Sequence, residues 1–161
     1  MSIAVVPGSF DPVTKGHLDI ITRSARVFDE VIVVVLQNPA KVTTFSVEER
    51  VDFIKRVTSD IPNVRVDSFS GLLVDYMTKE NANVIVKGLR AVSDFEYEYQ
   101  MALTNRKLKP DVETFFLNTS QEFMYLSSSI VKQIASFGGD VSDFLPEPIQ
   151  DDVQNRLRKG N

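Results

Sequence analysis

The sequence predicts a single α/β domain in which a parallel five-stranded sheet carries helices on both faces. Short apolar runs rich in β-branched residues alternate along the chain with amphipathic segments, which is typical of a parallel sheet covered by helices. The length of 161 residues and the hydrophobic content of 43% suffice for one core. Residues 1–161 are therefore expected to form one domain.

The strands of this sheet are expected where the β-branched runs lie. These runs are 3–6, 31–36, 64–67, 84–86 and 113–117. Between the first two runs, apolar residues recur at helical spacing, so one face of a helix can pack on the sheet. They are Leu18, Ile21, Ala25 and Phe28. Such β-α alternation is Rossmann-like.

The next two crossovers are also expected to be helical. Ser46 followed by Glu49 has the spacing of a capping box, and an apolar stripe follows it. The segment 72–81 supplies the third crossover. Each of these helices connects two strands that can pair in parallel.

Three further helices are expected in the second half of the chain. Ser93 with Glu96 repeats the capping-box spacing and opens a long helix that Pro110 stops. Ser128 or Ser129 is expected to cap a helix that runs to about Phe137. A last helix is expected to begin near Pro148, and the charged residues 156–161 are expected to fray.

Composition excludes several classes of site and partner. The chain has no cysteine and one histidine, so disulfides and thiolate metal sites are excluded. The net charge of −4 argues against sequence-independent binding to nucleic acid. No apolar segment approaches the roughly 18 residues that span a bilayer, and no signal peptide is visible. We therefore expect a cytoplasmic protein that binds neither nucleic acid nor membranes.

Polar residues follow the ends of the expected strands, and the carboxyl edge of a parallel sheet is where ligands bind. The turn after the first strand leads into a helix start, which favours an anion. Four loops bring cationic groups to this edge, namely His17, Lys41, Lys87 and Arg90. Gly88 between two of them favours close approach of a ligand. Positive groups without a paired carboxylate suit phosphoryl or nucleotidyl transfer.

Each feature also has a structural interpretation. His17 can be a helix cap, Lys41 a solvated loop lysine, and Lys87 with Arg90 a charged rim on a buried sheet. The serines at 127–129 can be an ordinary helix cap. The acidic and aromatic run 94–99 can be the mixed face of a helix or a contact between subunits.

Three sequence blocks together resemble the bacterial phosphopantetheine adenylyltransferases of the T-x-G-H nucleotidyltransferase superfamily. They are P-G-S-F-D-P-x-T-x-G-H at 7–17, G-L-R-A-V-S-D-F-E-Y-E at 88–98 and S-S-S-I-V-K at 127–132. The second block distinguishes this family from other adenylyl- and cytidylyltransferases that share the first. The resemblance covers essentially the whole chain.

The resemblance implies transfer of the adenylyl group of ATP to 4′-phosphopantetheine, which gives dephospho-coenzyme A and pyrophosphate. It also implies Mg²⁺ as cofactor, a homohexamer and coenzyme A as a candidate feedback ligand. Direct in-line attack by a phosphate oxygen on the α-phosphorus needs positioning and charge stabilisation rather than a general base. No residue of the chain is assigned to a metal.

The same resemblance implies roles for individual residues. His17 meets the ATP α-phosphate and Lys41 orients the attacking phosphate, so both are expected to be catalytic. ATP contacts are expected from Ser9, Phe10, His17, Gly88, Leu89, Arg90, Glu98, Phe123, Met124, Tyr125, Leu126, Ser127, Ser128 and Ser129. Substrate contacts are expected from Ser9, Lys41, Leu73 and Lys87. Many family members carry arginine at the position of Lys87, so a planar fork is replaced here by a point charge.

Two alternative functions are compatible with the same residues. The acceptor can be another phosphorylated compound, such as nicotinate mononucleotide or a phosphorylated alcohol. The chain can also be a sensor of coenzyme A or nucleotide without turnover. Pyrophosphate release with defined acceptors distinguishes the three.

Overall fold

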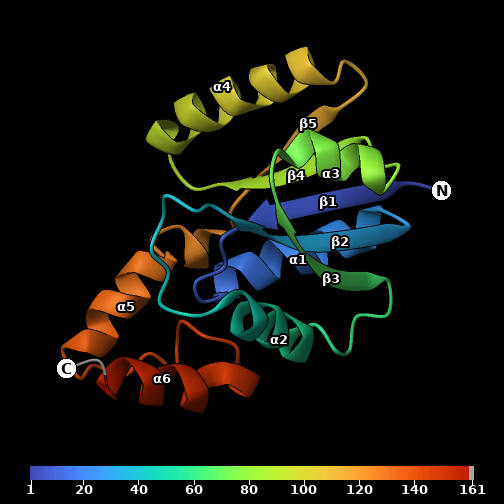
Figure 1. Cartoon of the computed structure of the whole chain (residues 1–161). Coiled ribbons are helices and arrows are strands. Elements are labelled where there is room, and N and C mark those ends of the chain that lie inside the picture. The colour runs from blue at the N-terminus through green and yellow to red at the C-terminus, as the bar shows by residue number, and fades with distance from the viewer. Residues whose placement is uncertain (160–161) are drawn as a thin grey trace.

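The computed structural model describes residues 1–159, apart from the side chains of Val92, Ser93 and Lys159. Its centre is a sheet of five parallel strands in the order β3-β2-β1-β4-β5 (Figure 1). The strands are β1 Ile3–Gly8, β2 Glu30–Gln37, β3 Val64–Ser70, β4 Val84–Leu89 and β5 Glu113–Asn118. The predicted fold class is therefore confirmed, and each expected strand is present.

Two strands that border the site run further than the sequence predicted. β1 continues to Gly8 because Pro7 and Gly8 remain in register with Val34 and Val35 of β2. β4 continues to Leu89 because its last three residues pair with residues 116–118 of β5. Lys87 and Gly88, expected in a loop, therefore lie on a strand, which fixes their backbone positions.

Helices cover both faces of the sheet (Figure 1). They are α1 Lys15–Val27, α2 Val47–Val57, α3 Leu73–Lys79, α4 Val92–Leu108, α5 Ser128–Ser136 and α6 Gln150–Lys159, with 3-10 turns at Gln121–Phe123 and Glu147–Ile149. On one face, Ala4, Val6 and Val33 pack with α1 and α2. On the other, Val5 and Ile32 pack with α3. The alternation of these strand residues thus supplies two apolar layers.

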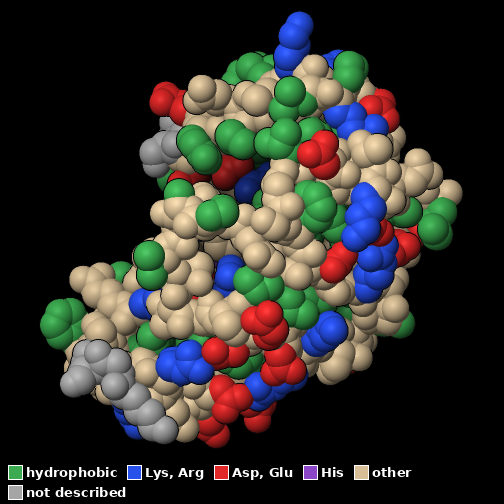
Figure 2. Space-filling model, viewed as in Figure 1, with side chains coloured by type: hydrophobic (Ala, Val, Ile, Leu, Met, Phe, Trp, Pro, Cys, Tyr) green, Lys and Arg blue, Asp and Glu red, His purple; other side chains and the backbone are tan. Residues whose placement is uncertain are grey.

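Helix α4 differs from the others because its apolar residues point in all directions and many are exposed. Its N-cap is Ala91, which makes no side-chain cap hydrogen bond, and the helix begins at Val92. The capping-box spacing predicted that Ser93 opens this helix. In the structure Ser93 lies inside the first turn instead, and Ala91 is the N-cap residue. Figure 2 shows apolar side chains gathered over this helix.

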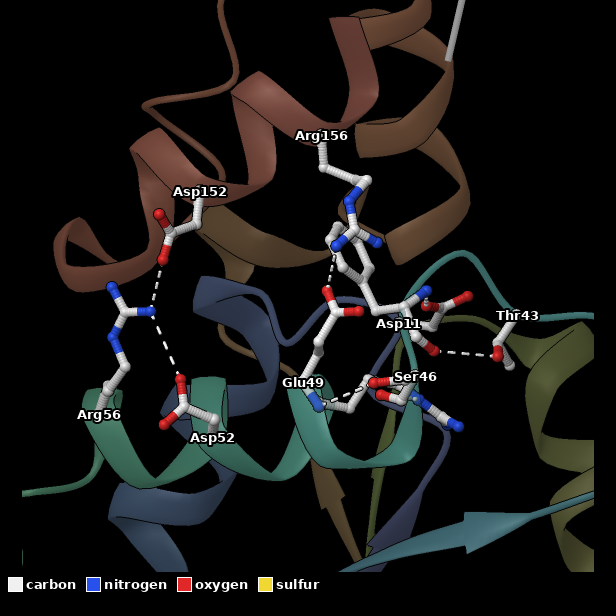
Figure 3. Close-up of polar contacts among 10 residues, drawn as sticks. Asp11, Thr43, Ser46, Glu49, Asp52, Arg56, Asp152 and Arg156 are labelled. Atoms are coloured by element: carbon white, nitrogen blue, oxygen red, sulfur yellow. Dashed lines mark hydrogen bonds and ion pairs between the residues drawn. The ribbon is translucent and has the colours of Figure 1, made fainter. Parts of the chain in front are cut away.

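The last helix, α6, is fixed to α2 by two ion pairs (Figure 3). Arg56 lies 2.6 Å from Asp152, and Arg156 lies 2.6 Å from Glu49. Over residues 156–159 the expected fraying is wrong, because Arg156 has this partner and α6 continues to Lys159, whereas residues 160–161 lie outside the described residues. No helix in the described part of the chain is long and apolar enough to cross a membrane.

Candidate active site

A pocket of about 260 Å³ opens at the carboxyl edge of β1 and β4, between the start of α1 and the start of α4. Figure 2 shows the surface hollowed beneath α4, with charged side chains inside the hollow. The residues that line the pocket are Val6, Pro7, Gly8, Phe10, Thr14, Gly16, His17, Ile20, Val86, Lys87, Gly88, Arg90, Asp94, Glu98, Thr119, Phe123, Leu126, Ser127 and Ser128. Its place in the sheet is the one expected for a ligand site in an open α/β fold.

His17 is held in one orientation by the start of α1. Thr14 is the N-cap, and its side-chain oxygen accepts a hydrogen bond from the His17 backbone N–H at 3.4 Å. The Thr14 backbone N–H in turn donates to Nδ1 of His17 at 3.0 Å. This is a capping box in which the imidazole takes the place of the usual Glu or Gln side chain.

The hydrogen bond from Thr14 also fixes the tautomer of His17. A backbone N–H can only donate, so Nδ1 is the unprotonated nitrogen and Nε2 carries the hydrogen. Burial, together with the positive charges of Arg90 and Lys87, lowers the pKa of His17 to about 4. At neutral pH the site therefore contains an uncharged imidazole that offers one N–H donor.

The turn before α1 is closed by Phe10. This residue has φ of 48°, and its ring packs edge-on against His17 with 5.0 Å between centroids. Phe10 is 3% exposed, and a side chain on Gly8 would meet its ring at 3.0 Å. The phenyl ring therefore supports the imidazole and leaves little room for a side chain at position 8.

The opposite wall of the pocket carries charge. Lys87 Nζ lies 3.4 Å from Glu98, and Arg90 Nε lies 3.3 Å from Asp94. Arg90 also donates from its guanidinium to the carbonyl oxygen of Leu126 at 2.9 Å. Two cations and two carboxylates thus face the pocket, with the carboxylates supplied by α4.

The structure brings most of the sequence-predicted site residues to this pocket. Those that line it are Phe10, His17, Lys87, Gly88, Arg90, Glu98, Phe123, Leu126, Ser127 and Ser128. Those outside the lining are Ser9, Lys41, Leu73, Leu89, Met124, Tyr125 and Ser129. Lys41 is exposed and lies in a turn in which its backbone N–H donates to Asn38.

The serines at 127–129 include the N-cap of α5 and two residues that line the pocket. The N-cap of α5 is Ser127, one residue before the expected position, and its hydroxyl accepts from the Ile130 backbone N–H at 3.1 Å. Ser128 donates its hydroxyl to the Pro12 carbonyl oxygen at 2.7 Å. The helix start is thus joined to the turn after β1.

The sequence analysis assigned no site role to two lining residues of chemical interest. Thr14 has a recognisable signal, because it stands three residues before a side chain that can bond back to it. Asp94 has none, because only the folded chain shows that it pairs with Arg90 and reaches the pocket.

Several known proteins are similar to this chain in sequence. The model of the cytidylyltransferase-like family matches residues 5–134. The chain is 58% identical over 159 residues to the phosphopantetheine adenylyltransferase of Caldanaerobacter subterraneus subsp. tengcongensis, with 99% of both chains covered. It is 60% identical over 153 residues to the phosphopantetheine adenylyltransferase of Clostridium tetani, with 95% of this chain and 96% of the relative covered.

Solved structures with low sequence identity share the fold. The Plasmodium falciparum nicotinic acid mononucleotide adenylyltransferase complexed with NaAD has a TM-score of 0.70 at 14% identity, covering 99% of this chain and 98% of that one. A bifunctional NMN adenylyltransferase/ADP ribose pyrophosphatase from Francisella tularensis has a TM-score of 0.71 at 19% identity, covering 98% of this chain and 49% of that one.

Proposed function

Because the chain belongs to the phosphopantetheine adenylyltransferase family, we propose that it transfers the adenylyl group of ATP to 4′-phosphopantetheine. The products are dephospho-coenzyme A and pyrophosphate, in the penultimate step of coenzyme A synthesis. The identity of 58% over nearly the full length carries this conclusion. The whole chain then acts as one nucleotidyltransferase domain.

The reaction is a direct displacement at phosphorus. A phosphate oxygen of phosphopantetheine forms a bond to the α-phosphorus of ATP, and the bond from that phosphorus to the bridging oxygen of pyrophosphate breaks. The attacking phosphate is already ionised near neutral pH, so no side chain has to remove a proton. The chain's task is to align two anions and to stabilise the extra charge of the transition state.

His17 is the group best suited to the reacting phosphate. Its Nε2 hydrogen is available to an α-phosphate oxygen because Nδ1 is occupied by Thr14. A neutral donor that is already oriented loses little in reorganisation when the transition state forms. Arg90 and Lys87 supply positive charge on the opposite wall and suit the other phosphate oxygens.

Lys41 would assist from the segment after β2, where it would orient the attacking phosphate. We assign ATP contacts to the pocket residues around Gly88 and around Phe123 to Ser129, together with Ser9, Phe10 and Glu98. Leu73 and Lys87 would serve the acceptor. Dephospho-coenzyme A would occupy both halves of the same site, and coenzyme A is its natural candidate for feedback.

Mg²⁺ fits this site as a cation carried by the phosphates of ATP. Among the described residues, no group of three or more His, Cys, Asp or Glu side chains could hold a metal ion. Mg²⁺ is commonly bound through substrate phosphates with one or two carboxylates, and Glu98 supplies such oxygens at the pocket wall. When bound, the ion neutralises charge on the departing pyrophosphate.

A homo-oligomer, with a hexamer as the specific expectation, accounts for the surface of α4. Tyr97 is 64% exposed and Leu103 is 52% exposed on this helix. Phe95 and Tyr99 stack with 5.4 Å between ring centroids, at 42% and 49% exposure. So many exposed apolar side chains on one element are typical of a contact between subunits.

The first test is pyrophosphate release from ATP and Mg²⁺ with 4′-phosphopantetheine, nicotinate mononucleotide or glycerol 3-phosphate as acceptor. Release with phosphopantetheine alone supports the proposal. Release with another acceptor keeps the chemistry and overturns the substrate. Silence with all three, together with tight binding of coenzyme A, indicates a sensor.

A further inference from the structure

We propose that Asp11 is a positioning residue for the transfer reaction, because its buried carboxylate holds the segment that carries Lys41 against the turn that carries Phe10. This inference rests on the proposed function, since the role it assigns belongs to that reaction. Asp11 does not line the pocket and is 6% exposed. It acts through the residues on either side of it.

The carboxylate of Asp11 grips two consecutive backbone N–H groups. Its Oδ2 accepts from Thr44 at 2.9 Å, and its Oδ1 accepts from Phe45 at 2.9 Å. Lys132 of α5 donates to Oδ2 at 3.1 Å and supplies the compensating charge. Each oxygen of a buried carboxylate thus has a partner, and such charge-assisted hydrogen bonds fix geometry strongly.

A second link joins the same two segments. Arg50 of α2 is 3% exposed and donates to the carbonyl oxygen of Ser9 at 2.9 Å. It also donates to the carbonyl oxygen of Ser46, the N-cap of α2, at 3.3 Å. Figure 3 shows Asp11 beside Thr43 and Ser46 at the beginning of α2. The turn after β1 and the start of α2 are therefore fastened at two points.

These links restrict the position of the backbone segment that carries Lys41. Its segment leaves the sheet after Gln37, which is in register with Ser70 of β3, and the next fixed point is Thr44 on Asp11. The side chain of Lys41 has no ion pair among the described residues, and residues 38–42 are exposed. Without the hydrogen bonds to Asp11, the buried ring of Phe45 would still anchor the segment near α2, but Thr44 would lose its link to the turn after β1.

The other side of Asp11 leads to His17. Phe10 precedes Asp11 directly, and its ring supports the imidazole. Asp11 therefore sets the position of the Lys41 segment relative to His17, the two groups that act on the reacting phosphates. A buried carboxylate is a costly way to fill space, and an apolar side chain would fill it more cheaply. The charge is explained by the two N–H groups that must be held in register.

The test compares Asp11→Asn in the wild-type chain and in Lys41→Ala. Asparagine keeps the shape and one acceptor oxygen but loses the second acceptor and the charge that faces Lys132. In the wild-type chain, kcat should fall by about 10- to 100-fold, the scale of a misplaced reacting group. In Lys41→Ala the same change should alter kcat by no more than about twofold, since two residues that act as a unit are not additive.

Asp67→Asn is the matched control. Asp67 is a half-buried carboxylate on β3 that accepts from the Tyr76 hydroxyl at 2.9 Å and from the Ser68 backbone N–H at 2.8 Å, outside the pocket lining. The same chemical change there should leave kcat unchanged. Hydrogen exchange gives a readout that does not depend on turnover: Asp11→Asn should accelerate exchange at the N–H groups of Thr44 and Phe45, and Asp67→Asn should not.

Several results would overturn the proposal. These are an equal loss of kcat from Asp11→Asn in both backgrounds, no loss in an active wild-type chain, or full activity of Lys41→Ala. An inactive wild-type chain would instead overturn the proposed function, and the exchange experiment would then decide whether Asp11 anchors the segment. Should Asp11→Asn fail to fold, Asp11→Glu keeps the charge for Lys132 but displaces the carboxylate, and it carries the same test.

Discussion

The two walls of the pocket are built by different physical means. On the α1 wall, His17 is uncharged, oriented by Thr14 and supported by the buried ring of Phe10. On the α4 wall, Lys87 and Arg90 are charged and partly exposed, and each pairs with a carboxylate of α4. The first wall is fixed before a ligand arrives, and the second wall can exchange partners.

This difference matches the demands of adenylyl transfer. Stabilising a transition state requires a donor whose position is already correct, and neutral hydrogen bonds within a buried turn provide that rigidity. Attracting a highly charged substrate requires mobile cations near solvent, whose internal ion pairs are weak enough to be replaced. The walls thus divide positioning from attraction, and the following predictions test that division in order of decreasing effect.

Removal of the fixed donor should have the largest effect. His17→Ala should lower kcat about 100-fold or more, the scale seen when one preorganised donor is lost. Steady-state pyrophosphate release at saturating substrates measures it.

His17→Gln keeps the cap and changes the donor. Glutamine at this position can still accept from the Thr14 N–H, so the capping box and the fold should persist. Its amide NH₂ can also donate but lies on a flexible side chain and not on a fixed ring, so kcat should fall by less than in His17→Ala. If His17→Ala retained near-normal turnover, the α1 wall would not stabilise the reacting phosphate.

The uncharged state of His17 also predicts a pH dependence of stability. The pKa of His17 is about 4 in the folded chain and near 6.5 in an exposed histidine. Between these values the unfolded chain binds a proton that the folded chain does not, so the free energy of unfolding falls as pH drops from about 6.5 to about 4. The contribution is up to about 3 kcal/mol, present in full above pH 6.5.

Urea unfolding near pH 7 and near pH 4 measures this contribution. The difference between the two pH values should be smaller in His17→Gln, which has no imidazole to titrate, by up to about 3 kcal/mol. Equal pH dependence in the two proteins would mean that His17 titrates at its ordinary pKa, and the α1 wall would then become cationic below about pH 6.5.

The sequence predicted the sheet and most helix limits because these depend on local patterns. β-branched runs identified every strand, and Ser46 caps α2 as its spacing indicated, with the Glu49 N–H donating to its hydroxyl at 3.1 Å. The glutamate side chain does not complete the capping box, because it pairs with Arg156, 107 residues away. Such distant partners have no signal in a local pattern.

Most of the residues predicted for the site line the pocket, but the limits of the elements that carry them were predicted less well. Three consecutive serines are equally good caps, so the sequence could not choose Ser127 over its neighbours. The end of β4 depends on how far β5 runs beside it, which only the paired strands define. Asp94 lines the pocket and pairs with Arg90, and its place in the acidic and aromatic run 94–99 gave no sign of this.

Gly88 lies where the two walls meet and was expected to allow close approach of a ligand. The structure gives a further reason: a Cβ on Gly88 would lie 2.9 Å from Cγ1 of Ile20 on α1. Gly88→Ala should therefore destabilise the fold by about 1–3 kcal/mol, the range for overpacking a core. Thermal unfolding measures it, with Gly138→Ala as a contrast.

Replacing Gly138 by alanine should destabilise the fold for a different reason from replacing Gly88. It has φ of 79° and nothing within 4 Å of an added Cβ, so Gly138→Ala meets backbone strain and no clash. Replacing Ile20 by alanine as well should recover part of the loss in Gly88→Ala and none of the loss in Gly138→Ala. If replacing Ile20 restores no stability to Gly88→Ala, the contact between Gly88 of β4 and Ile20 of α1 does not set the distance between the two walls.

The smallest expected effect concerns the α4 wall, whose ion pairs can be replaced by a ligand. Asp94 lies 3.3 Å from Arg90 and is about one-third exposed, so the pair is worth less than about 1 kcal/mol. Asp94→Asn should free Arg90 for phosphate and remove a negative charge from the pocket, lowering the KM for ATP by about two- to fivefold with kcat unchanged. Raising the salt concentration should shrink this difference, because partly exposed charges are screened.

A fall in kcat in Asp94→Asn would instead show that the carboxylate acts in the transfer step, for example through the cation that accompanies ATP. The α4 wall would then share the positioning task, and the division between a rigid neutral wall and an adjustable charged wall would fail. Since His17 and Asp94 face the same pocket, the KM and kcat effects of the two substitutions provide the most direct measure of that division.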